Sequence, residues 1–224
     1  MKLKAGKDYK KNVYVLDDNG DLLTFKEFID DYKNVSIESY FRVTISAHDL
    51  IMEGTDGRLK YLASTTDLKV DVHGTKLGIW GTFGSGDDFV RVGSGGSNVE
   101  LGEGRNVFRG GDGKDGVTGG TQADTLHGGG GNDVIRGGGG KDVLSGGKGK
   151  DFFSYEAFED FKARITDFKV GEDKLNLMGW YRGDISIKNV DGGVLLTNPE
   201  NSSDSILLEG VRRKELLADD SWFV

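Results

Sequence analysis

A nine-residue repeat constrains this chain more than any other feature. Written in nines, residues 83–154 read FGSGDDFVR, VGSGGSNVE, LGEGRNVFR, GGDGKDGVT, GGTQADTLH, GGGGNDVIR, GGGGKDVLS and GGKGKDFFS. The second place is glycine in all eight repeats, and the fourth is glycine in seven, with Gln122 as the exception. The sixth place is Asp in six repeats, and the eighth is apolar in all of them. A period this regular predicts one structural unit per repeat.

Each repeat has one place for a buried side chain and several residues that must turn. The apolar eighth place predicts a strand of three residues with that side chain inward, and the glycines before it permit tight turns. Such a strand cannot bury a core alone, so the repeats must stack as a solenoid with two repeats in each coil. The first three repeats start with Phe83, Val92 and Leu101, which we expect to point inward.

Stacking with this period aligns the sixth-place residues in two rows, one along each edge of the solenoid. One row contains Asp88, Asn106, Asp124 and Asp142, and the other contains Ser97, Asp115, Asp133 and Asp151. Carboxylates one rung apart, about 4.8 Å, repel each other unless a cation lies between them. Carboxylates and turn carbonyls offer only oxygen ligands, which suit calcium better than zinc or copper. The pattern therefore predicts calcium ions between coils.

The repeats from GGDGKDGVT to GGKGKDFFS resemble the nonapeptide Gly-Gly-x-Gly-x-Asp-x-apolar-x of the RTX (hemolysin-type calcium-binding) family, closely over 110–154 and more loosely over 83–109. This resemblance implies an all-β fold, a right-handed parallel β-roll, in which Asp carboxylates and the turn carbonyls of places two and four hold several calcium ions. The metal ligands that it implies within the repeats are Asp88, Asn106, Gly111, Gly113, Asp115, Gly120, Gln122, Asp124, Gly129, Gly131, Asp133, Gly138, Gly140, Asp142, Gly147, Gly149 and Asp151.

The gaps between these ligands are not expected to be equal. The pairs with two carboxylates, which we expect to bind most strongly, are Asp115/Asp133, Asp133/Asp151 and Asp124/Asp142. Gaps that use Asn106 should be weaker because an amide oxygen carries no full charge. The gap between Ser97 and Asp115 is expected to be empty.

Residues 155–224 are expected to form a C-terminal antiparallel β cap. Its first part, ITDFKVGEDKLNL (165–177), resembles the stretch after the roll in this family, where an acidic residue often closes the last calcium site. Asp167 and Asp173 are the candidates, with a plain surface turn as the equal alternative. Alternation and turn residues in 185–211 predict three short antiparallel strands, and RKELLADD (213–220) predicts a brief helix.

The last seven residues, ADDSWFV, resemble the uncleaved C-terminal signal that type I secretion machinery reads in this family. The alternative is a packed C-terminal strand. The N-terminus has a basic start without the apolar stretch of a secretory signal peptide, which favours the export signal.

Residues 1–82 are expected to form a β-rich region with one short helix. Asn19-Gly20 predicts a hairpin, and Thr24 with Glu27 predicts a capping box for a helix over about 25–33. Strands are predicted in FRVTIS, DLIME, RLKYLA, LKVDV and KLGIW, between residues 41 and 80. We expect them to be irregular early rungs from about residue 40 onward, with a separate small β-domain as the alternative.

Several function classes find no support in the sequence. Without cysteine there is no disulfide and no thiolate site. The net charge of −8 argues against a nucleic-acid partner, and no run of 18 apolar residues predicts a membrane span. The three histidines, His48, His73 and His127, form no zinc-protease motif, and neither a Gly-x-Ser-x-Gly elbow nor a phosphate-binding loop occurs. We therefore expect no catalytic residues.

These observations predict a secreted protein or module, extracellular or on the cell surface, which binds calcium without catalysing a reaction and folds on meeting millimolar calcium. Its expected parts are an N-terminal region (1–82), the repeats (83–154) and the cap (155–224).

Two alternatives stay open. The first is the C-terminal RTX module of a larger secreted enzyme such as a protease, lipase or polysaccharide epimerase; upstream coding sequence in the same reading frame would reveal it. The second is an adhesin or surface-layer component, in which residues 1–82 bind a surface partner or each other; light scattering with calcium would detect such assembly.

Overall fold

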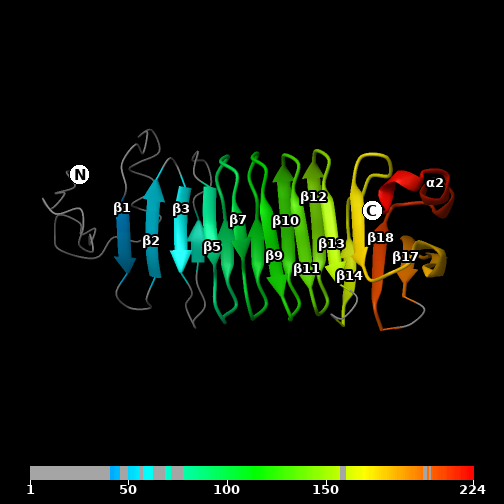
Figure 1. The fold of residues 1–224 in the computed structure, drawn as a ribbon, viewed down its shortest axis with the longest axis horizontal. Helices are drawn as coiled ribbons and strands as arrows, with labels where there is room; N and C mark the ends of the chain where they lie inside the picture. Colours follow the sequence, from blue (N-terminus) through cyan, green and yellow to red (C-terminus); the bar gives the residue numbers. More distant parts are fainter. Residues whose placement is uncertain are drawn as a thin grey trace, which may run out of the picture.

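The chain forms a long solenoid in which strands alternate between two sheets, coil after coil along the long axis (Figure 1). The computed structural model describes residues 41–45, 50–55, 58–62, 69–71, 78–156, 160–198, 201 and 203–224. The hairpin and the helix predicted within residues 1–40 lie outside the described residues. The described chain is built mainly from strands, with a few short helical segments, which confirms the predicted all-β class.

Within the residues that the structure describes, each sheet contains nine strands. In spatial order the first sheet contains β1 (Phe41–Ile45), β2 (Leu50–Thr55), β3 (Arg58–Leu62), β5 (Gly78–Thr82), β7 (Asn98–Glu100), β9 (Gly116–Gly120), β11 (Val134–Gly138), β13 (Phe152–Glu156) and β15 (Lys174–Met178). The second contains β16 (Ser186–Val190), β17 (Gly193–Thr197), β18 (Ser205–Glu209), β14 (Lys162–Ile165), β12 (Val143–Lys148), β10 (Thr125–Gly130), β8 (Val107–Arg109), β6 (Phe89–Arg91) and β4 (Lys69–Asp71). Successive strands of the repeats thus fall in opposite sheets.

The predicted coil of two repeats is confirmed by the strand register. In the first sheet Val134 pairs in parallel with Gly116 and Phe152, which occupy the same place two repeats before it and two repeats after it. All eight apolar residues at the eighth place are 3% exposed or less. Phe83, Val92 and Leu101 are also buried, as expected. The core of the solenoid is therefore one side chain per strand, widened in the first coils.

The stack continues beyond the regular repeats at both ends. After them, Leu144 pairs in parallel with Ile165 and Phe153 with Leu175, and all four side chains are fully buried. Before them, β3 pairs in parallel with β5 and β4 with β6, so the predicted irregular rungs exist. Strands β1, β2 and β3 pair antiparallel with one another in sequence. The expectation of rungs from about residue 40 is thus corrected: rungs start at β3, and β1 and β2 extend the first sheet.

The predicted cap of residues 155–224 is only partly antiparallel, because β14 and β15 pair in parallel and continue the roll. The three predicted antiparallel strands and the predicted helix follow them. Strands β16, β17 and β18 pair antiparallel, and β18 joins the second sheet by pairing in parallel with β14. The predicted brief helix is α2 (Arg213–Ala218), which the short 3-10 helix η2 (Asp220–Trp222) follows. Another 3-10 helix, η1 (Arg182–Asp184), precedes β16. None of the helices in the described part of the chain has the length and hydropathy that crossing a membrane requires.

The last residues pack onto the end of the stack. Trp222 is fully buried and its indole Nε1 donates to the carbonyl oxygen of Leu216 at 2.8 Å. Phe223 forms a bridge with Leu175, and the amide of Val224 donates to the Leu175 carbonyl at 3.2 Å. In the folded chain the tail therefore packs as the structural alternative predicted. Its role in export stays a prediction.

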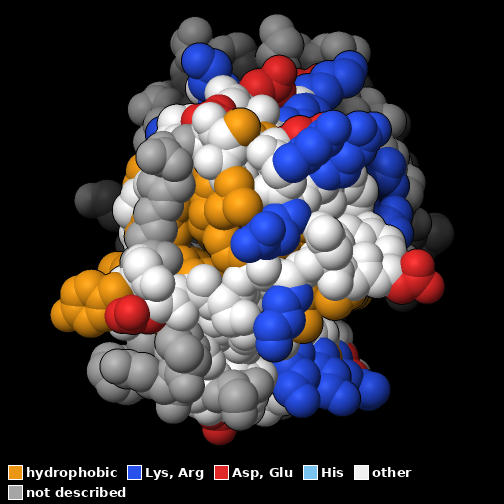
Figure 2. All heavy atoms as spheres, turned by 90° about the vertical axis from the view of Figure 1, so that its right-hand side faces the viewer, with side chains coloured by type: hydrophobic (Ala, Val, Ile, Leu, Met, Phe, Trp, Pro, Cys, Tyr) orange, Lys and Arg blue, Asp and Glu red, His pale blue; other side chains and the backbone are white. Residues whose placement is uncertain are grey.

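The C-terminal end also carries basic side chains, although the chain is acidic overall. Figure 2 views this end and shows Lys and Arg side chains gathered on one side of an apolar area. A hollow of about 490 Å³ lies between the β16–β17 turn and the start of α2, and its basic lining residues are Arg212, Arg213 and Lys214. The cap thus differs in charge from the edges of the roll, where Asp side chains are aligned.

Candidate metal centre

The sixth-place side chains form two hydrogen-bonded rows. In each row Oδ1 of one residue accepts the backbone amide of the sixth-place residue one coil earlier. In the first row the amides of Ser97, Asp115 and Asp133 donate to Asp115, Asp133 and Asp151 over 2.7 to 2.9 Å. In the second row the amides of Asp88, Asn106 and Asp124 donate to Asn106, Asp124 and Asp142 over 2.7 to 3.0 Å. The two predicted rows therefore exist with the predicted register.

The rows lie inside the molecule. The sixth-place Asp and Asn side chains are all 1–2% exposed. The sequence predicted the alignment of these side chains. It did not predict how deeply they are buried, nor the hydrogen bond that each Oδ1 accepts from a backbone amide. Since a buried carboxylate needs a compensating charge or hydrogen bonds, the second oxygen of each carboxylate decides what the rows can bind.

Three of these second oxygens have no hydrogen-bond partner: Oδ2 of Asp124, of Asp133 and of Asp151. Each points at the glycine in the first place of its own repeat; a Cβ on Gly128, for example, would collide with Oδ2 of Asp133. The absence of a side chain at this glycine leaves a cradle beside a buried, unpaired carboxylate oxygen. This arrangement suits a bound cation.

The turn glycines allow the coils to approach each other closely. Gly129 and Gly131, in the second and fourth places, have φ of 104° and 119°, which side chains rarely adopt. A Cβ on either residue would also collide with a carbonyl oxygen of the preceding coil, at Gly111 or Gly113. Glycine at these places is therefore required by both conformation and space, and the turn carbonyls of adjacent coils lie close to one another.

Burial and mutual repulsion make these carboxyl groups reluctant to ionise. Burial raises the pKa of Asp133 to about 7, and the charges of Asp115 and Asp151 contribute to this increase. The pKa of Asp124 is likewise raised to about 7, by burial and by the charge of Asp142. Burial also raises the pKa of Asp115, Asp151 and Asp173 above its ordinary value. A calcium ion would reverse this effect by stabilising the charged form.

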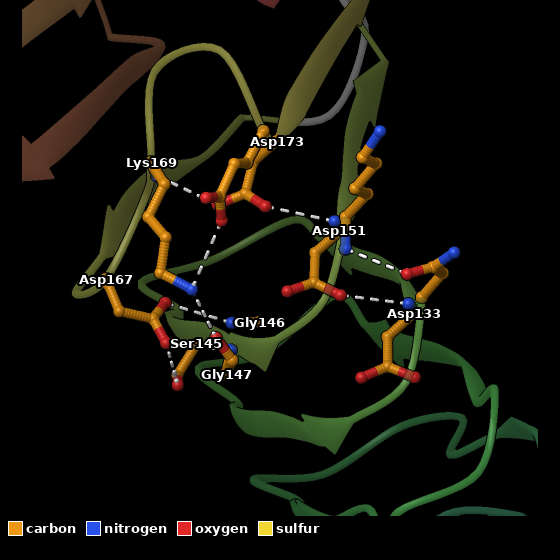
Figure 3. Close-up of polar contacts among 11 residues, drawn as sticks. Asp133, Ser145, Gly146, Gly147, Asp151, Asp167, Lys169 and Asp173 are labelled. Atoms are coloured by element: carbon orange, nitrogen blue, oxygen red, sulfur yellow. Dashed lines mark hydrogen bonds and ion pairs between the residues drawn. The ribbon is translucent and has the colours of Figure 1, made fainter.

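Asp173 extends the first row by one coil. Its Oδ1 accepts the amide of Asp151 at 3.0 Å, as in the repeats, and its Oδ2 accepts the amide of Lys169 at 2.8 Å (Figure 3). Asp151 lies 22 residues before Asp173 and Gly147 lies 22 residues before Lys169, so FKVGEDKLN is a degenerate further repeat. That spacing was a signal in the sequence. Asp173 therefore occupies the next sixth-place position of the first row, and its role as a metal ligand stays a prediction.

Lys169 projects its ammonium group into this last gap. Its Nζ donates to the carbonyl oxygen of Gly147 at 2.8 Å and lies 3.7 Å from Glu172 (Figure 3). Burial raises the pKa of both Asp151 and Asp173, and the positive charge of Lys169 opposes that rise. The last gap thus contains a protein cation at a place where every regular repeat has glycine.

Asp167 lies beside this gap but outside the row. Its Oδ1 accepts the amide of Gly146 at 3.0 Å, and its Oδ2 accepts the amide of Gly147 and the hydroxyl of Ser145, both at 2.8 Å (Figure 3). Both oxygens therefore already fasten the turn of the last regular repeat. A metal-ligand role for Asp167 stays a prediction.

The second row ends differently, at an aromatic plug. The Tyr155 hydroxyl donates to Oδ2 of Asp142 at 3.2 Å, and the Tyr155 ring stacks on Phe161 at 4.3 Å between centroids. Phe161 in turn stacks on Trp180 at 5.8 Å. In the following coil Ala163 stands opposite Asp142, so this row has no further carboxylate in the same position. The repeat pattern in the sequence did not predict this plug.

The turn carbonyls and Gln122 have roles of their own in the coil contacts. The carbonyls of Gly111 and Gly120 accept amides of the next coil, from Gly130 and Gly139. Oε1 of Gln122 accepts the amide of Gly104 at 2.9 Å. A carbonyl oxygen has two lone pairs, so an oxygen that accepts one hydrogen bond still has a lone pair that can bind a metal ion. The assignment of Gly111, Gly113, Gly120, Gln122, Gly129, Gly131, Gly138, Gly140, Gly147 and Gly149 as ligands stays a prediction.

Oxygen is the only kind of donor in these rows, which fits a hard cation. The residues that fit calcium best are Asp124, Asp133 and Asp151, because each has an unpaired, buried carboxylate oxygen beside a side-chain-free cradle. Calcium would supply the positive charge that these oxygens lack.

Comparison with known proteins agrees with this chemistry. The profile of the RTX calcium-binding nonapeptide repeat, with four copies, matches residues 84–117, 93–126 and 118–153. A search of curated proteins finds no match. Among solved structures, the chain is similar to the AlgE6R3 subunit of the Azotobacter vinelandii mannuronan C5-epimerase (24% identity, 70% of this chain and 78% of that chain, TM-score 0.36). It is also similar to the extracellular lipase LipA from Serratia marcescens (17% identity, 76% of this chain and 40% of that chain, TM-score 0.32).

The profile covers the residues that build both Asp rows, including Asp124, Asp133 and Asp151 with their buried, unpaired oxygens. Residues 84–153 of this chain therefore match the RTX calcium-binding nonapeptide repeat.

Proposed function

We propose that this chain is a non-catalytic module whose function is to fold on binding extracellular calcium. RTX repeats bind calcium, and proteins that carry them are secreted by type I systems. The observation that carries the proposal is the set of buried, unpaired oxygens on Asp124, Asp133 and Asp151. Without a cation, folding must bury these carboxylates uncompensated, at a cost of several kcal/mol each by general estimates, about the size of a domain's whole stability.

The thin core supports a calcium requirement. Each regular repeat buries one apolar side chain at its eighth place, and burying one such side chain contributes only about 1.5–3 kcal/mol. Ordering a whole repeat costs more than this, since backbone entropy alone is about 1–2 kcal/mol per residue. Ion binding therefore supplies folding free energy that the repeats lack.

The non-catalytic part of the proposal rests on what the buried polar groups do. The Oδ1 atoms of Asp115, Asp124, Asp133 and Asp151 bind backbone amides of a neighbouring coil, which is a structural use of these carboxylates. The histidine in the described part of the chain, His127, lies in β10 with Arg109 and Ser145 as its neighbours in β8 and β12. The hydroxyl of Ser145 donates to Oδ2 of Asp167, which also accepts the amide of Gly147, so these groups hold a turn of the roll.

Calcium titration followed by far-ultraviolet circular dichroism tests the proposal. In chelator the chain should lack strand signal, and millimolar calcium should produce it cooperatively, whereas magnesium at the same concentration should not. A spectrum rich in strand in chelator that calcium does not change would overturn the proposal. An assay on ester, peptide and polysaccharide substrates with the calcium-loaded chain tests the non-catalytic part, for which no turnover is expected.

A further inference from the structure

A second group of oxygens lies in the C-terminal cap, outside both rows. Strands β14 and β18 pair in parallel with Lys162 opposite Ser205, so Asp160 and Asp204 precede neighbouring strands at the same end. The segment that leads into β18 places Asn201 and Ser203 beside them. Asn201, Ser203 and Asp204 belong to the connection between β17 and β18, and Asp160 lies just before β14. The nonapeptide pattern includes none of these four residues.

The side-chain oxygens of this cap cluster, Asp160, Asn201, Ser203 and Asp204, converge on one hydroxyl group. Ser203 Oγ lies 2.7 Å from Oδ1 of Asn201 and 3.4 Å from Oδ1 of both Asp160 and Asp204. A serine hydroxyl has a single proton to donate, so it can satisfy only one of these three acceptors. Nδ2 of Asn201 also donates to Oδ1 of Asp160, and the amide of Ser203 donates to Oδ1 of Asn201, both over 3.3 Å. The carboxylate of Asp204 is therefore the acceptor that the cluster itself leaves least satisfied.

The side chain of Asp204 gives a second reason to expect a ligand here, separate from the contacts of Ser203. Its side chain is fully buried, and its Oδ2 has no hydrogen-bond partner. Its Oδ1 has only long contacts, at 3.4 Å from the amide of Phe161 and 3.4 Å from Ser203 Oγ. Burial raises the pKa of Asp204, and the negative charge of Asp160 contributes to the rise. The negative charge of Asp160 therefore repels the ionised form of the Asp204 carboxyl group.

We propose that the cap cluster is a calcium site in which Asp204 and Asp160 supply the charge and Asn201 and Ser203 supply neutral oxygen ligands. The donors are all oxygen and include two carboxylates, as calcium prefers. The ion would join the loop before β18 to the start of β14, and so fasten the cap to the roll. The site goes beyond the proposed function, because Ala163 interrupts the second row between Asp142 and this cluster.

Equilibrium dialysis of the full chain with radioactive calcium tests the site. At saturation Asp204→Asn should bind one calcium ion fewer per chain than the wild type, since the amide keeps the size of the side chain but loses its charge. Asp160→Asn, at an exposed position, should bind this ion more weakly or lose it. The matched control Asp191→Asn, an exposed acidic residue of the β16–β17 turn in the same cap, should bind the wild-type number.

The alternatives have distinct outcomes. If Asp204→Asn and Asp160→Asn both bind the wild-type number of ions with unchanged affinity, the site does not exist. If Asp204→Asn fails to fold, the count for Asp160→Asn decides. Failure of the proposed function looks different, because the wild type itself would then bind no calcium or would fold without it.

Discussion

The backbone amide of Asp133 donates to Oδ1 of Asp151, 2.9 Å away and 18 residues later in the chain. The carboxylate of Asp151 therefore joins two coils with one oxygen, while its other oxygen is buried without a partner. One side chain thus contributes both to the stacking of the solenoid and to the demand for a cation. Substitutions at such positions should separate these two roles.

Asp133 is the position where the two roles can be measured. Asp133→Ala removes the amide acceptor for Asp115 and a charged ligand of the two gaps on either side. Asp133→Asn keeps an acceptor oxygen but loses the charge. Loss of a hydrogen bond to a charged group costs about 1.5–3 kcal/mol, so both variants should need clearly more calcium to fold, and the Ala variant should need the most.

Circular dichroism during calcium titration measures these midpoints. Asp88→Ala, at the start of the second row and facing Asn106, should change the midpoint little. Asp112→Ala, an exposed turn residue, is the control for removing an acidic side chain from a repeat. Equal midpoints for the Asp133 and Asp88 variants would show that the two-row register does not govern calcium binding.

The raised pKa values predict a dependence on pH. In the calcium-free folded chain the pKa of Asp124 and Asp133 is about 7, against an ordinary value of 3.8. A carboxyl group that binds its proton more tightly when folded stabilises the fold below pH 3.8, and this contribution is lost as the pH rises through 7. The calcium-free chain should therefore show more strand signal at pH 5 than at pH 8.

Calcium binding should show the opposite trend. The ion must displace the protons held by these carboxyl groups, so the calcium midpoint should rise as the pH falls from 8 to 6. Titrations at fixed ionic strength at pH 6, 7 and 8 would measure it. A midpoint that does not change over this range would contradict the raised pKa values.

Tyr155 should stabilise the end of the second row. Its hydroxyl donates to the buried Oδ2 of Asp142, so Tyr155→Phe should lower the free energy of unfolding in saturating calcium by about 1.5–3 kcal/mol. Urea unfolding measures the change. Tyr181→Phe is the matched control, because that side chain is 74% exposed, and it should have the stability of the wild type. A Tyr155→Phe variant as stable as this control would show that the plug does not depend on the hydroxyl.

The nonapeptide pattern was sufficient to predict the coil, its register and the two rows. The period fixes which residues stack, since Leu126 and Leu144 can only be neighbours if each coil consists of two repeats. The same pattern could not reveal that Oδ1 of each Asp binds an amide of the neighbouring coil, because this depends on the depth of the side chain below the surface. Burial of that kind is a property of the assembled turns.

The ends of the rows were harder to predict for a different reason. Tyr155 occupies the first place of what would be the next repeat. Its hydrogen bond to Asp142 is seen only in the folded chain. Asp204 lies far beyond Asp173 in the chain, in a loop without periodicity, so the sequence gives no indication that it is buried. Such sites depend on contacts between distant segments, which a repeat pattern does not encode.

Trp222 can separate the structural role of the tail from its predicted role in export. Its side chain is fully buried and its indole donates to Leu216, so Trp222→Ala should cost about 3–5 kcal/mol of stability in calcium. Removal of the whole tail, ADDSWFV, should therefore weaken the folded cap as well as abolish export through a type I system. Val224→Ala, at a residue 55% exposed, is the control and should affect neither property.

If the tail is the export signal, the secretion machinery reads it before the chain folds in calcium. Trp222→Ala should then still be exported and should unfold at lower urea than the wild type. Loss of export that parallels the loss of stability across these variants would instead identify the tail as a structural element alone.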